Sequence, residues 1–349
     1  MKTKLWFVAT LAVLLGAFTG VSSAQVKLTG AGSTFDYPIF SKWFDVYHKM
    51  TGVQINYASI GSGGGIRQVT EGTVDFGASD APLTPAQMDA FKKARGTDVV
   101  HIPIIIGGVA ITYNLPSVGH GIKLDGAALA DIYLGKITKW NDPRLVKLNP
   151  DKKLPNRAIL VAHRSEGSGT TFIFTSYLSK VSPEWAKKCG NSTSVDWPVG
   201  LGAKGTEGVA GIISQTVGSI GYVELAYAKQ NNLPFCELKN KAGNFIDVNF
   251  NSVSEAAAGA AKNMPKDLRA VITNAEGKQS YPICGFSWVV IPKDFANTEH
   301  GKALVKFLKW AVTEGQKDAT SLYYAPLPKP VQKLDLEKLN SITSNGKKL

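Results

Sequence analysis

Three times along this chain, an apolar run typical of a buried strand ends in a turn of Gly, Ser and Thr, and a helical pattern begins there. The turns are Gly32-Ser33-Thr34-Phe35, Gly61-Ser62-Gly63-Gly64 and Gly167-Ser168-Gly169-Thr170. Each helix start presents unpaired backbone N–H groups and the positive end of a dipole. Glycine lets an anion approach the backbone closely, and Ser and Thr add hydroxyl donors at the same place. One such turn is ordinary, but three in one chain indicate an anion site built from helix starts.

Helical and strand patterns alternate along the whole chain, which predicts an α/β fold. Apolar residues recur at helical spacing from Ile39 to Met50, and Gly52 is a plausible helix stop. Two Val/Ile-rich runs, His101–Tyr113 and Ile283–Ile291, suit buried strands that cross between lobes. We therefore expect two α/β lobes, the first of them built from both ends of the chain. The predicted boundaries are 25–106 and 283–349 for the first lobe and 107–282 for the second.

The remaining elements follow from shorter patterns. Thr84-Pro85 is typical of an N-cap followed by proline at the first helical position. The stretch Ile137–Asp142 is expected to be a surface loop. Other predicted strands are Val26–Leu28, Gln54–Ala58, Val74–Asp80, Ile159–His163 and Gly218–Val223, and other predicted helices begin near Ser62 and span Leu129–Leu134, Glu224–Gln230 and Thr298–Val312.

The first 24 residues are typical of an export signal. Lys2 and Lys4 precede the apolar run Leu5–Val21, and the small residues of Ser22–Ala24 predict cleavage after Ala24. The apolar run is at the short limit for a membrane span, so an uncleaved anchor is the alternative. No cysteine follows the run, which argues against a lipid anchor. The mature chain of about 325 residues suits two domains and is expected in the periplasm.

Charge and metal-binding residues exclude several classes of protein. The net charge of +12 falls to +10 without Lys2 and Lys4, and the surplus is spread along the chain, unlike a nucleic-acid-binding arm. The five histidines show no zinc-binding spacing, so neither a metal nor a cofactor is expected. In an oxidising compartment the three cysteines allow one disulfide with one thiol left over. These residues are His48, His101, His120, His163 and His300, and Cys189, Cys236 and Cys284.

Two charged residues sharpen the anion hypothesis. Arg164 precedes the third turn, and arginine can hold two oxygens of a tetrahedral oxyanion; the alternative is a surface ion pair, for instance with Glu166. Asp80 follows a strand-like run in the loop Ala78–Pro82, where the alternative role is a turn or helix cap. An ionised Asp80 can accept a hydrogen bond from phosphate, which carries a proton near neutral pH, but not from sulfate. A polar group left unpaired in a dry site could support discrimination on the order of 10⁴ to 10⁵.

The chain resembles the periplasmic phosphate-binding protein of the bacterial high-affinity phosphate ABC transporter, over essentially all of its mature length. The resemblance rests on Leu28–Phe35, Val74–Pro82, Asp131–Ile137, Gly167–Thr170, Gly221–Glu224 and Ala226–Asn232. It implies a type II periplasmic binding protein: two α/β lobes joined by two crossing strands, with the ligand cleft between them. It also implies that the protein closes over phosphate and docks on a permease.

The same resemblance implies which residues bind phosphate. They are Thr34, Phe35, Ser62 and Asp80 from the first lobe, and Arg164, Ser168, Gly169 and Thr170 from the second. Glu166 stands where the family often has an aspartate that pairs with the site arginine, so the placement of Arg164 could differ here. The implied partners are phosphate and the inner-membrane permease and ATPase, with the free protein a monomer and no enzymatic activity.

Three other readings compete with a phosphate-binding protein. A serine hydrolase lacks a GxSxG element, and a metal phosphatase lacks clustered Asp and His ligands. A sulfate or molybdate binder is disfavoured by Asp80. An adhesive surface role remains open, although Trp140 and Trp185 are expected to pack against a lobe. The sequence does not reveal the affinity, the docking surface or the disulfide pairing.

Overall fold

A central eight-stranded sheet runs through the molecule. The structure, a computed structural model, describes residues 26–261 and 263–349, so the predicted export signal and its cleavage site lie outside the described residues. The strands in sheet order are β2 (Gln54–Ser59), β1 (Lys27–Gly32), β3 (Phe76–Ser79), β11 (Cys284–Pro292), β4 (Val99–Tyr113), β8 (Ser219–Glu224), β6 (Leu160–Arg164) and β7 (Leu201–Ala203). Strands β1, β2 and β3 are mutually parallel, as are β6, β7 and β8, while β4 and β11 are antiparallel to their neighbours.

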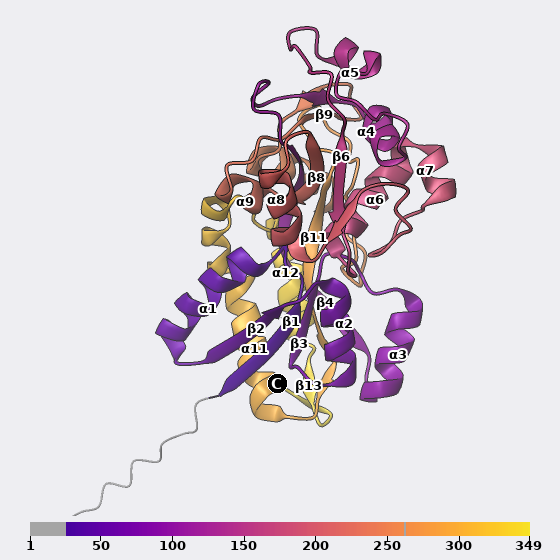
Figure 1. The fold of residues 1–349 in the computed structure, drawn as a ribbon. Helices are drawn as coiled ribbons and strands as arrows, with labels where there is room; N and C mark the ends of the chain where they lie inside the picture. Colours follow the sequence, from indigo (N-terminus) through magenta and orange to yellow (C-terminus); the bar gives the residue numbers. More distant parts are fainter. Residues whose placement is uncertain (1–25, 262) are drawn as a thin grey trace, which may run out of the picture.

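Strand β4 connects the two halves of the sheet. Its residues 99–108 pair with β11, and its residues 109–113 pair with β8. Nearly every residue of β4 is buried, as expected of a strand covered on both faces. The half with β2, β1, β3 and β11 forms the first lobe, and the half with β8, β6 and β7 forms the second (Figure 1). The predicted α/β fold is therefore confirmed; both Val/Ile-rich runs form buried strands, β4 and β11, and β4 pairs with strands of both halves.

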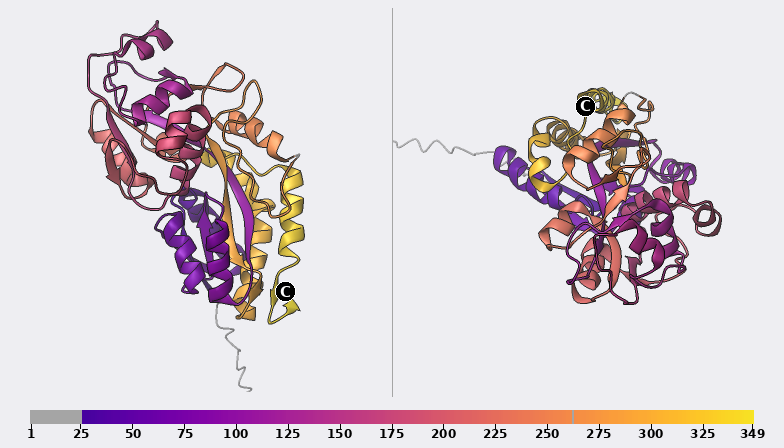
Figure 2. Two further views of the ribbon diagram at one scale, coloured as in Figure 1. Left: turned by 90° about the vertical axis from the view of Figure 1, so that its right-hand side faces the viewer. Right: turned by 90° about the horizontal axis from the view of Figure 1, so that it is seen from above.

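Helices cover both lobes. Segments from both ends of the described chain lie together around the first lobe, while the middle of the chain forms the second, as Figures 1 and 2 show by colour. The first lobe carries α1 (Tyr37–Thr51), α2 (Ser62–Glu71), α3 (Pro85–Arg95), α11 (Thr298–Ala311), α12 (Lys329–Leu339), the short helices η1 (Glu314–Asp318) and η2 (Thr320–Leu322), and a small sheet of β12 (Asp294–Phe295), β13 (Thr343–Ser344) and β14 (Lys347–Lys348). The second lobe carries α4 (Gly126–Tyr133), α5 (Pro143–Leu148), α6 (Gly169–Val181), α7 (Pro183–Lys188), α8 (Gly205–Gln215), α9 (Leu225–Gln230), and a small sheet of β10 (Phe245–Ile246), β9 (Glu237–Lys239) and β5 (Lys123–Leu124). Helix α10 (Phe250–Ala261) contacts β4 and β11.

The local signals in the sequence explain where helices begin and end. In α1 the apolar face is buried as predicted, and Gly52 ends the helix with φ of 78°, a conformation that glycine adopts without strain. Met50 was expected on that face, but 61% of its surface is exposed. Thr84 caps α3 with a full capping box, because Gln87 returns a hydrogen bond to the Thr84 backbone.

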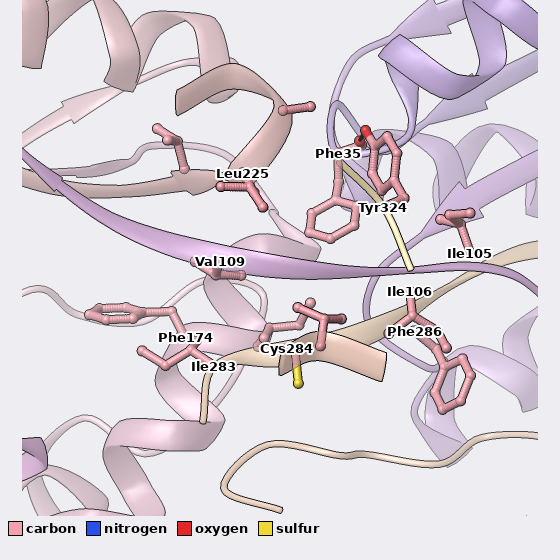
Figure 3. Packing of buried hydrophobic residues seen from close by; sticks show 14 of the residues in the cluster. Phe35, Ile105, Ile106, Val109, Phe174, Leu225, Ile283, Cys284, Phe286 and Tyr324 are labelled. Carbon is pink, nitrogen blue, oxygen red and sulfur yellow. Dashed lines mark hydrogen bonds between the residues drawn. The ribbon is translucent and has the colours of Figure 1, made fainter. Parts of the chain in front are cut away.

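The strand β4 is also where aromatic side chains from distant segments meet. Figure 3 shows Phe35 and Tyr324 beside β4 near Ile106, with their ring centroids 6.1 Å apart. A Cβ atom at Gly107 would lie 2.4 Å from the Phe35 ring, so only glycine allows this close approach. The residue that ends the first glycine-rich turn is therefore anchored on the strand that joins the lobes.

Several smaller expectations can also be compared with the structure. All three cysteines are free, so the disulfide that the sequence allowed does not form. Trp140 and Trp185 are fully buried, as predicted. The segment 137–142 is a loop, as predicted, but Ile137 and Trp140 within it are buried. The Trp140 indole N–H is satisfied by Gly218 O at 2.9 Å. Within the described ranges, no helix combines the length and apolar character needed to cross a membrane.

Candidate functional site

The three glycine-rich turns predicted from the sequence meet between the lobes. The backbone N–H of Gly63 at the start of α2 donates to Gly167 O at 2.9 Å. The backbone N–H of Gly169, the first residue of α6, donates to Ser62 Oγ at 3.0 Å. Each turn follows the carboxyl end of a parallel strand, which is the usual place for ligands in open α/β sheets. Helix starts from both lobes therefore point at one small region.

Two further hydrogen bonds cross between the lobes beside the first turn. Thr34 Oγ1 lies 2.9 Å from Thr206 Oγ1, and the Tyr227 hydroxyl donates to Thr34 O at 2.9 Å. Thr206 lies in the first turn of α8, so a fourth helix start faces the same region. With these contacts the lobes are closed on each other around the site.

Ser62 connects the two lobes through its hydroxyl group. Its Oγ accepts from Asp80 N at 3.3 Å and from Gly169 N at 3.0 Å. Both contacts use lone pairs, so the hydroxyl hydrogen of Ser62 is available to a ligand. The side chain is 1% exposed, and a donor in so dry a site needs a partner.

Asp80 is the acidic residue at the centre of the site. It follows β3, is 1% exposed, and its Oδ1 accepts from the hydroxyls of Ser33 at 2.6 Å and Ser287 at 2.8 Å. Burial raises the pKa of Asp80 to about 6, while the two serines, Arg164 and Thr170 favour its charged form and limit the rise. Its Oδ2 lies close to Gly169: a Cβ atom added at Gly169 would lie 2.6 Å from this oxygen. One carboxylate oxygen is thus held by the protein, and the other points to the start of α6.

Arg164 brings the positive charge of the site from the end of β6. Its side chain is 2% exposed, and both Nε, at 2.8 Å, and Nη2 donate to Glu166 Oε1. Its Nη1 donates to Thr206 Oγ1 at 3.2 Å. Burial disfavours the charged form of Glu166, but the hydrogen bond and charge of Arg164 outweigh it, and the pKa of Glu166 is lowered. The ion pair that the sequence suggested is therefore present, and glutamate fixes one edge of the guanidinium.

The third turn supplies the start of α6. Ser168 caps the helix, its Oγ accepting from Thr171 N at 3.1 Å. The Thr170 hydroxyl is buried and makes no well-aligned hydrogen bond within the described residues. It lies close enough to the Asp80 carboxylate to lower the pKa of that group. This hydroxyl is therefore another donor that a bound ligand could satisfy.

All eight residues predicted to bind the ligand occur around this one site. Thr34 and Phe35 lie at the first helix start, Ser62 at the second, and the remaining residues surround Asp80 from the second lobe. The backbone N–H of Phe35 donates to Ser33 Oγ at 3.0 Å, so in this closed state it already has a partner. The predicted set is Thr34, Phe35, Ser62, Asp80, Arg164, Ser168, Gly169 and Thr170.

Sequence reasoning missed several residues that contact the site. Thr206 follows the strand β7 and Gly205, so a fourth strand–glycine–helix pattern in the sequence could have indicated it. Ser33 lies inside a turn that was recognised, but its hydroxyl was not assigned. Asp36 and Ser287 reach the Asp80 network from residues whose local sequence gives no such signal. Across residues 26–261 and 263–349, no group of three or more His, Cys, Asp or Glu side chains could hold a metal ion.

Comparison with known proteins finds one matching family model and several similar phosphate-binding proteins. A family model described as the PBP superfamily domain matches residues 19–314. A phosphate-binding protein PstS from Pasteurella multocida is 46% identical over 342 residues, covering 97% of each chain. The one from Haemophilus influenzae is 46% identical and covers 95% of this chain and 96% of its own length.

Solved structures of low sequence identity share the fold. A high-affinity periplasmic phosphate-binding protein (PfluDING) bound with phosphate has a TM-score of 0.68 at 19% identity, covering 88% of this chain and 92% of its own. A phosphate ABC transporter substrate-binding protein from Clostridium perfringens has a TM-score of 0.61 at 18% identity, covering 86% and 100%. These likenesses confirm the predicted fold class: a type II periplasmic binding protein with two α/β lobes joined by crossing strands.

Proposed function

Since this chain belongs to the PBP superfamily and, within it, to the PstS family of phosphate-binding proteins, we propose that it binds one inorganic phosphate ion between its lobes. It delivers that ion to the membrane permease and ATPase of an ABC phosphate importer. It works as a monomer in the periplasm after cleavage of its signal peptide behind Ala24. Proteins of this family bind their substrate and are not enzymes, so the hydrolase alternative is dropped.

The observation that carries this proposal is the excess of hydrogen-bond donors around a single acceptor oxygen. The Ser62 and Thr170 hydroxyls, the helix starts and the Arg164 guanidinium all donate, whereas Asp80 Oδ2 accepts. Donors at helix N-termini suit an anion without many full charges. The acceptor suits an anion that still carries a proton. Phosphate meets both conditions near neutral pH, and sulfate meets only the first.

The eight predicted residues act as the phosphate site in this proposal. Arg164 binds phosphate oxygens with the guanidinium N–H groups that Glu166 does not use, since Glu166 accepts one hydrogen bond from Nε and one from Nη2. Ser62, Thr34, Ser168, Thr170 and the backbone of Gly169 and Phe35 donate, and Asp80 accepts the phosphate proton. Thr34, Phe35 and the backbone N–H of Gly169 lose their present partners when phosphate replaces them.

Lobe closure is the mechanism of capture in this proposal. Contacts such as Gly63 N to Gly167 O form only when the lobes meet, and a bound ion that bridges both lobes favours that closed state. The change of sheet partner along β4 lies between Gly108 and Val109, close to the lobe boundary proposed between residues 106 and 107. The second boundary is proposed between residues 282 and 283. The permease recognises the closed form.

Calorimetric titration of the mature protein tests the proposal directly. Co-purified ligand is first removed by reversible unfolding, and phosphate and then sulfate are titrated at pH 8. We expect one phosphate per protein and no heat from sulfate. Binding of both anions would keep the anion site but refute the role of Asp80. Binding of neither by refolded protein would refute the proposed function.

A further inference from the structure

The hydroxyl of Ser287 lies between two carboxyl groups. Its Oγ is 2.7 Å from Asp36 Oδ2 and 2.8 Å from Asp80 Oδ1. Ser287 lies at a β-bulge in β11, where the pairing with β4 shifts between Ser287 and Trp288. Bulges re-aim side chains next to functional sites, and this one directs Ser287 to both acids. Asp36, Ser287 and Asp80 are all at most 1% exposed.

The count of hydrogens at this contact requires a proton on one acid. Both distances are those of O–H···O hydrogen bonds, yet a serine hydroxyl carries only one hydrogen. If both carboxyls were ionised, one of the two contacts would bring lone pairs together in a dry site. One of the two carboxyls must therefore donate to Ser287 Oγ, while Ser287 donates to the other.

The surroundings of Asp36 and Asp80 favour different protonation states. Asp80 Oδ1 also accepts from the Ser33 hydroxyl at 2.6 Å, while Ser33 Oγ accepts from Phe35 N–H at 3.0 Å. Arg164 adds a favourable positive charge to Asp80. These contacts favour an ionised Asp80.

Asp36 has no comparable support for a negative charge. Its Oδ1 has no hydrogen-bond partner among the described residues, and its strongest charged neighbours are the acids Asp80 and Glu224. Burial first, and then Asp80, raise the pKa of Asp36 well above its usual range. The other titratable groups that face Asp36 are the buried tyrosines Tyr57 and Tyr324, which bring no positive charge.

We propose that Asp36 holds a proton for the binding site. The protonated Asp36 carboxyl donates to Ser287 Oγ, Ser287 donates to Asp80 Oδ1, and Asp80 thereby remains an ionised acceptor. This inference rests on the proposed function, and it makes Asp36 and Ser287 positioning residues for Asp80 that set the selectivity of the site.

The location of the shared proton determines which anion fits. Two neighbouring carboxyls that share one proton titrate as a pair, and the environment decides where the proton resides. With the proton on Asp80 Oδ1, Asp80 is neutral, and its Oδ2 repels a fully deprotonated anion such as sulfate much less. With the proton on Asp36, Asp80 accepts and requires a proton on the ligand. Asp36 therefore keeps Asp80 ionised, which is the form that discriminates phosphate from sulfate.

Infrared difference spectroscopy tests the proton location without any ligand. At pH 8, we expect the carbonyl stretch of a protonated carboxylic acid in the unmodified protein, and loss of that band in Asp36→Asn. The matched control is Asp335→Asn, another buried acid with a raised pKa, which takes part in none of the hydrogen bonds at this site. That control should remove a carboxylic-acid band of its own and leave the ratio of phosphate to sulfate affinity unchanged.

Variants of the relay test its effect on selectivity. Ser287→Ala removes a donor to a charged carboxylate, and we expect phosphate-over-sulfate discrimination at pH 7 to fall about 10-fold or more. Asp36→Ala lets Ser287 turn to Ser79 O, 3.4 Å away, and should lower discrimination about 3- to 10-fold. Asp36→Asn restores an N–H donor to Ser287 and should rescue most of that loss, which a purely structural role for the carboxyl would not predict.

The two proposals fail in different ways. If Asp36→Asn leaves the carboxylic-acid band unchanged while the unmodified protein binds phosphate, the proton assignment is overturned and the proposed function stands. If the band behaves as expected but no phosphate binds, the proposed function is overturned and the proton assignment stands. If Asp36→Ala and Ser287→Ala keep full discrimination against sulfate, the relay does not set selectivity.

Discussion

Replacement of Asp80 by Asn should stabilise the ligand-free protein and at the same time weaken its selectivity. The asparagine amide oxygen can accept from Ser33 and Ser287 as Asp80 Oδ1 does, so the two hydrogen bonds are retained. The buried negative charge disappears, and an N–H₂ group replaces the oxygen near Gly169. That group is a donor, so sulfate becomes an acceptable ligand.

The size of the stabilisation follows from the pKa of Asp80. Burial raises it from 3.8 to about 6, and each pKa unit corresponds to about 1.4 kcal/mol, so the charged form destabilises the folded state by roughly 3 kcal/mol. Because the folded protein holds this proton more tightly than the unfolded chain, stability is present below pH 3.8 and is lost as the pH rises to about 6. Asp80→Asn removes this loss, so its gain is largest at pH 8 and small near pH 4.

Thermal unfolding of stripped protein at pH 4.5 and pH 8 measures this effect. For a chain of this length, a gain of about 3 kcal/mol raises the midpoint temperature by roughly 4 °C at pH 8. Asp89→Asn, which removes an exposed carboxylate on α3, is the matched control and should change the midpoint little at either pH. A midpoint that falls at pH 8, or rises equally at both pH values, would refute the reasoning about the buried charge.

Three further variants probe other parts of the structure. Asp335→Asn should raise the midpoint by about 2 °C at pH 8 and less near pH 4, because burial raises the pKa of Asp335 and neither carboxylate oxygen has a partner among the described residues; calorimetry at both pH values checks this. Glu166→Gln should lower phosphate affinity about 10-fold in calorimetric titration, since the Arg164 guanidinium loses a charged partner, and unchanged affinity would mean that Glu166 does not position it. Gly107→Ala should destabilise the protein by about 1–3 kcal/mol in urea unfolding, because the new Cβ would lie 2.4 Å from the Phe35 ring; a smaller loss would show that the ring can move.

Local sequence patterns predicted the parts of the fold that depend on neighbouring residues. The apolar face of α1, the glycine that ends it and the cap of α3 all lie within one or two helical turns of the residues that signal them. The β-rich run of β4 was likewise recognised from its own composition. The exposed Met50 shows the limit, because helical spacing alone does not determine where the apolar face ends.

Contacts between distant segments could not be predicted in this way. Ser287 meets Asp36, a residue 251 positions away, only because β11 lies beside β3 and a bulge turns the serine towards both acids. Whether any cysteines pair could not be predicted for the same reason, since the number of cysteines does not give their separation in the fold. The resemblance to a known family identified residues that contact the ligand in that family, and it carried no information on the acid behind them.

The protonation of the buried acids explains why an anion site can contain the negatively charged Asp80 at its centre. Asp36, Asp80 and Glu224 are each at most 1% exposed, and burial raises the pKa of all three. If all three were ionised, their repulsion would oppose both folding and anion binding, since unpaired buried charges cost several kcal/mol each. Protonation of Asp36 leaves the negative charge of this pair on Asp80, the member that has Arg164 as a neighbour. Selectivity for a proton-bearing anion thus depends on Asp36, which keeps its proton, as much as on Asp80, which has lost its proton.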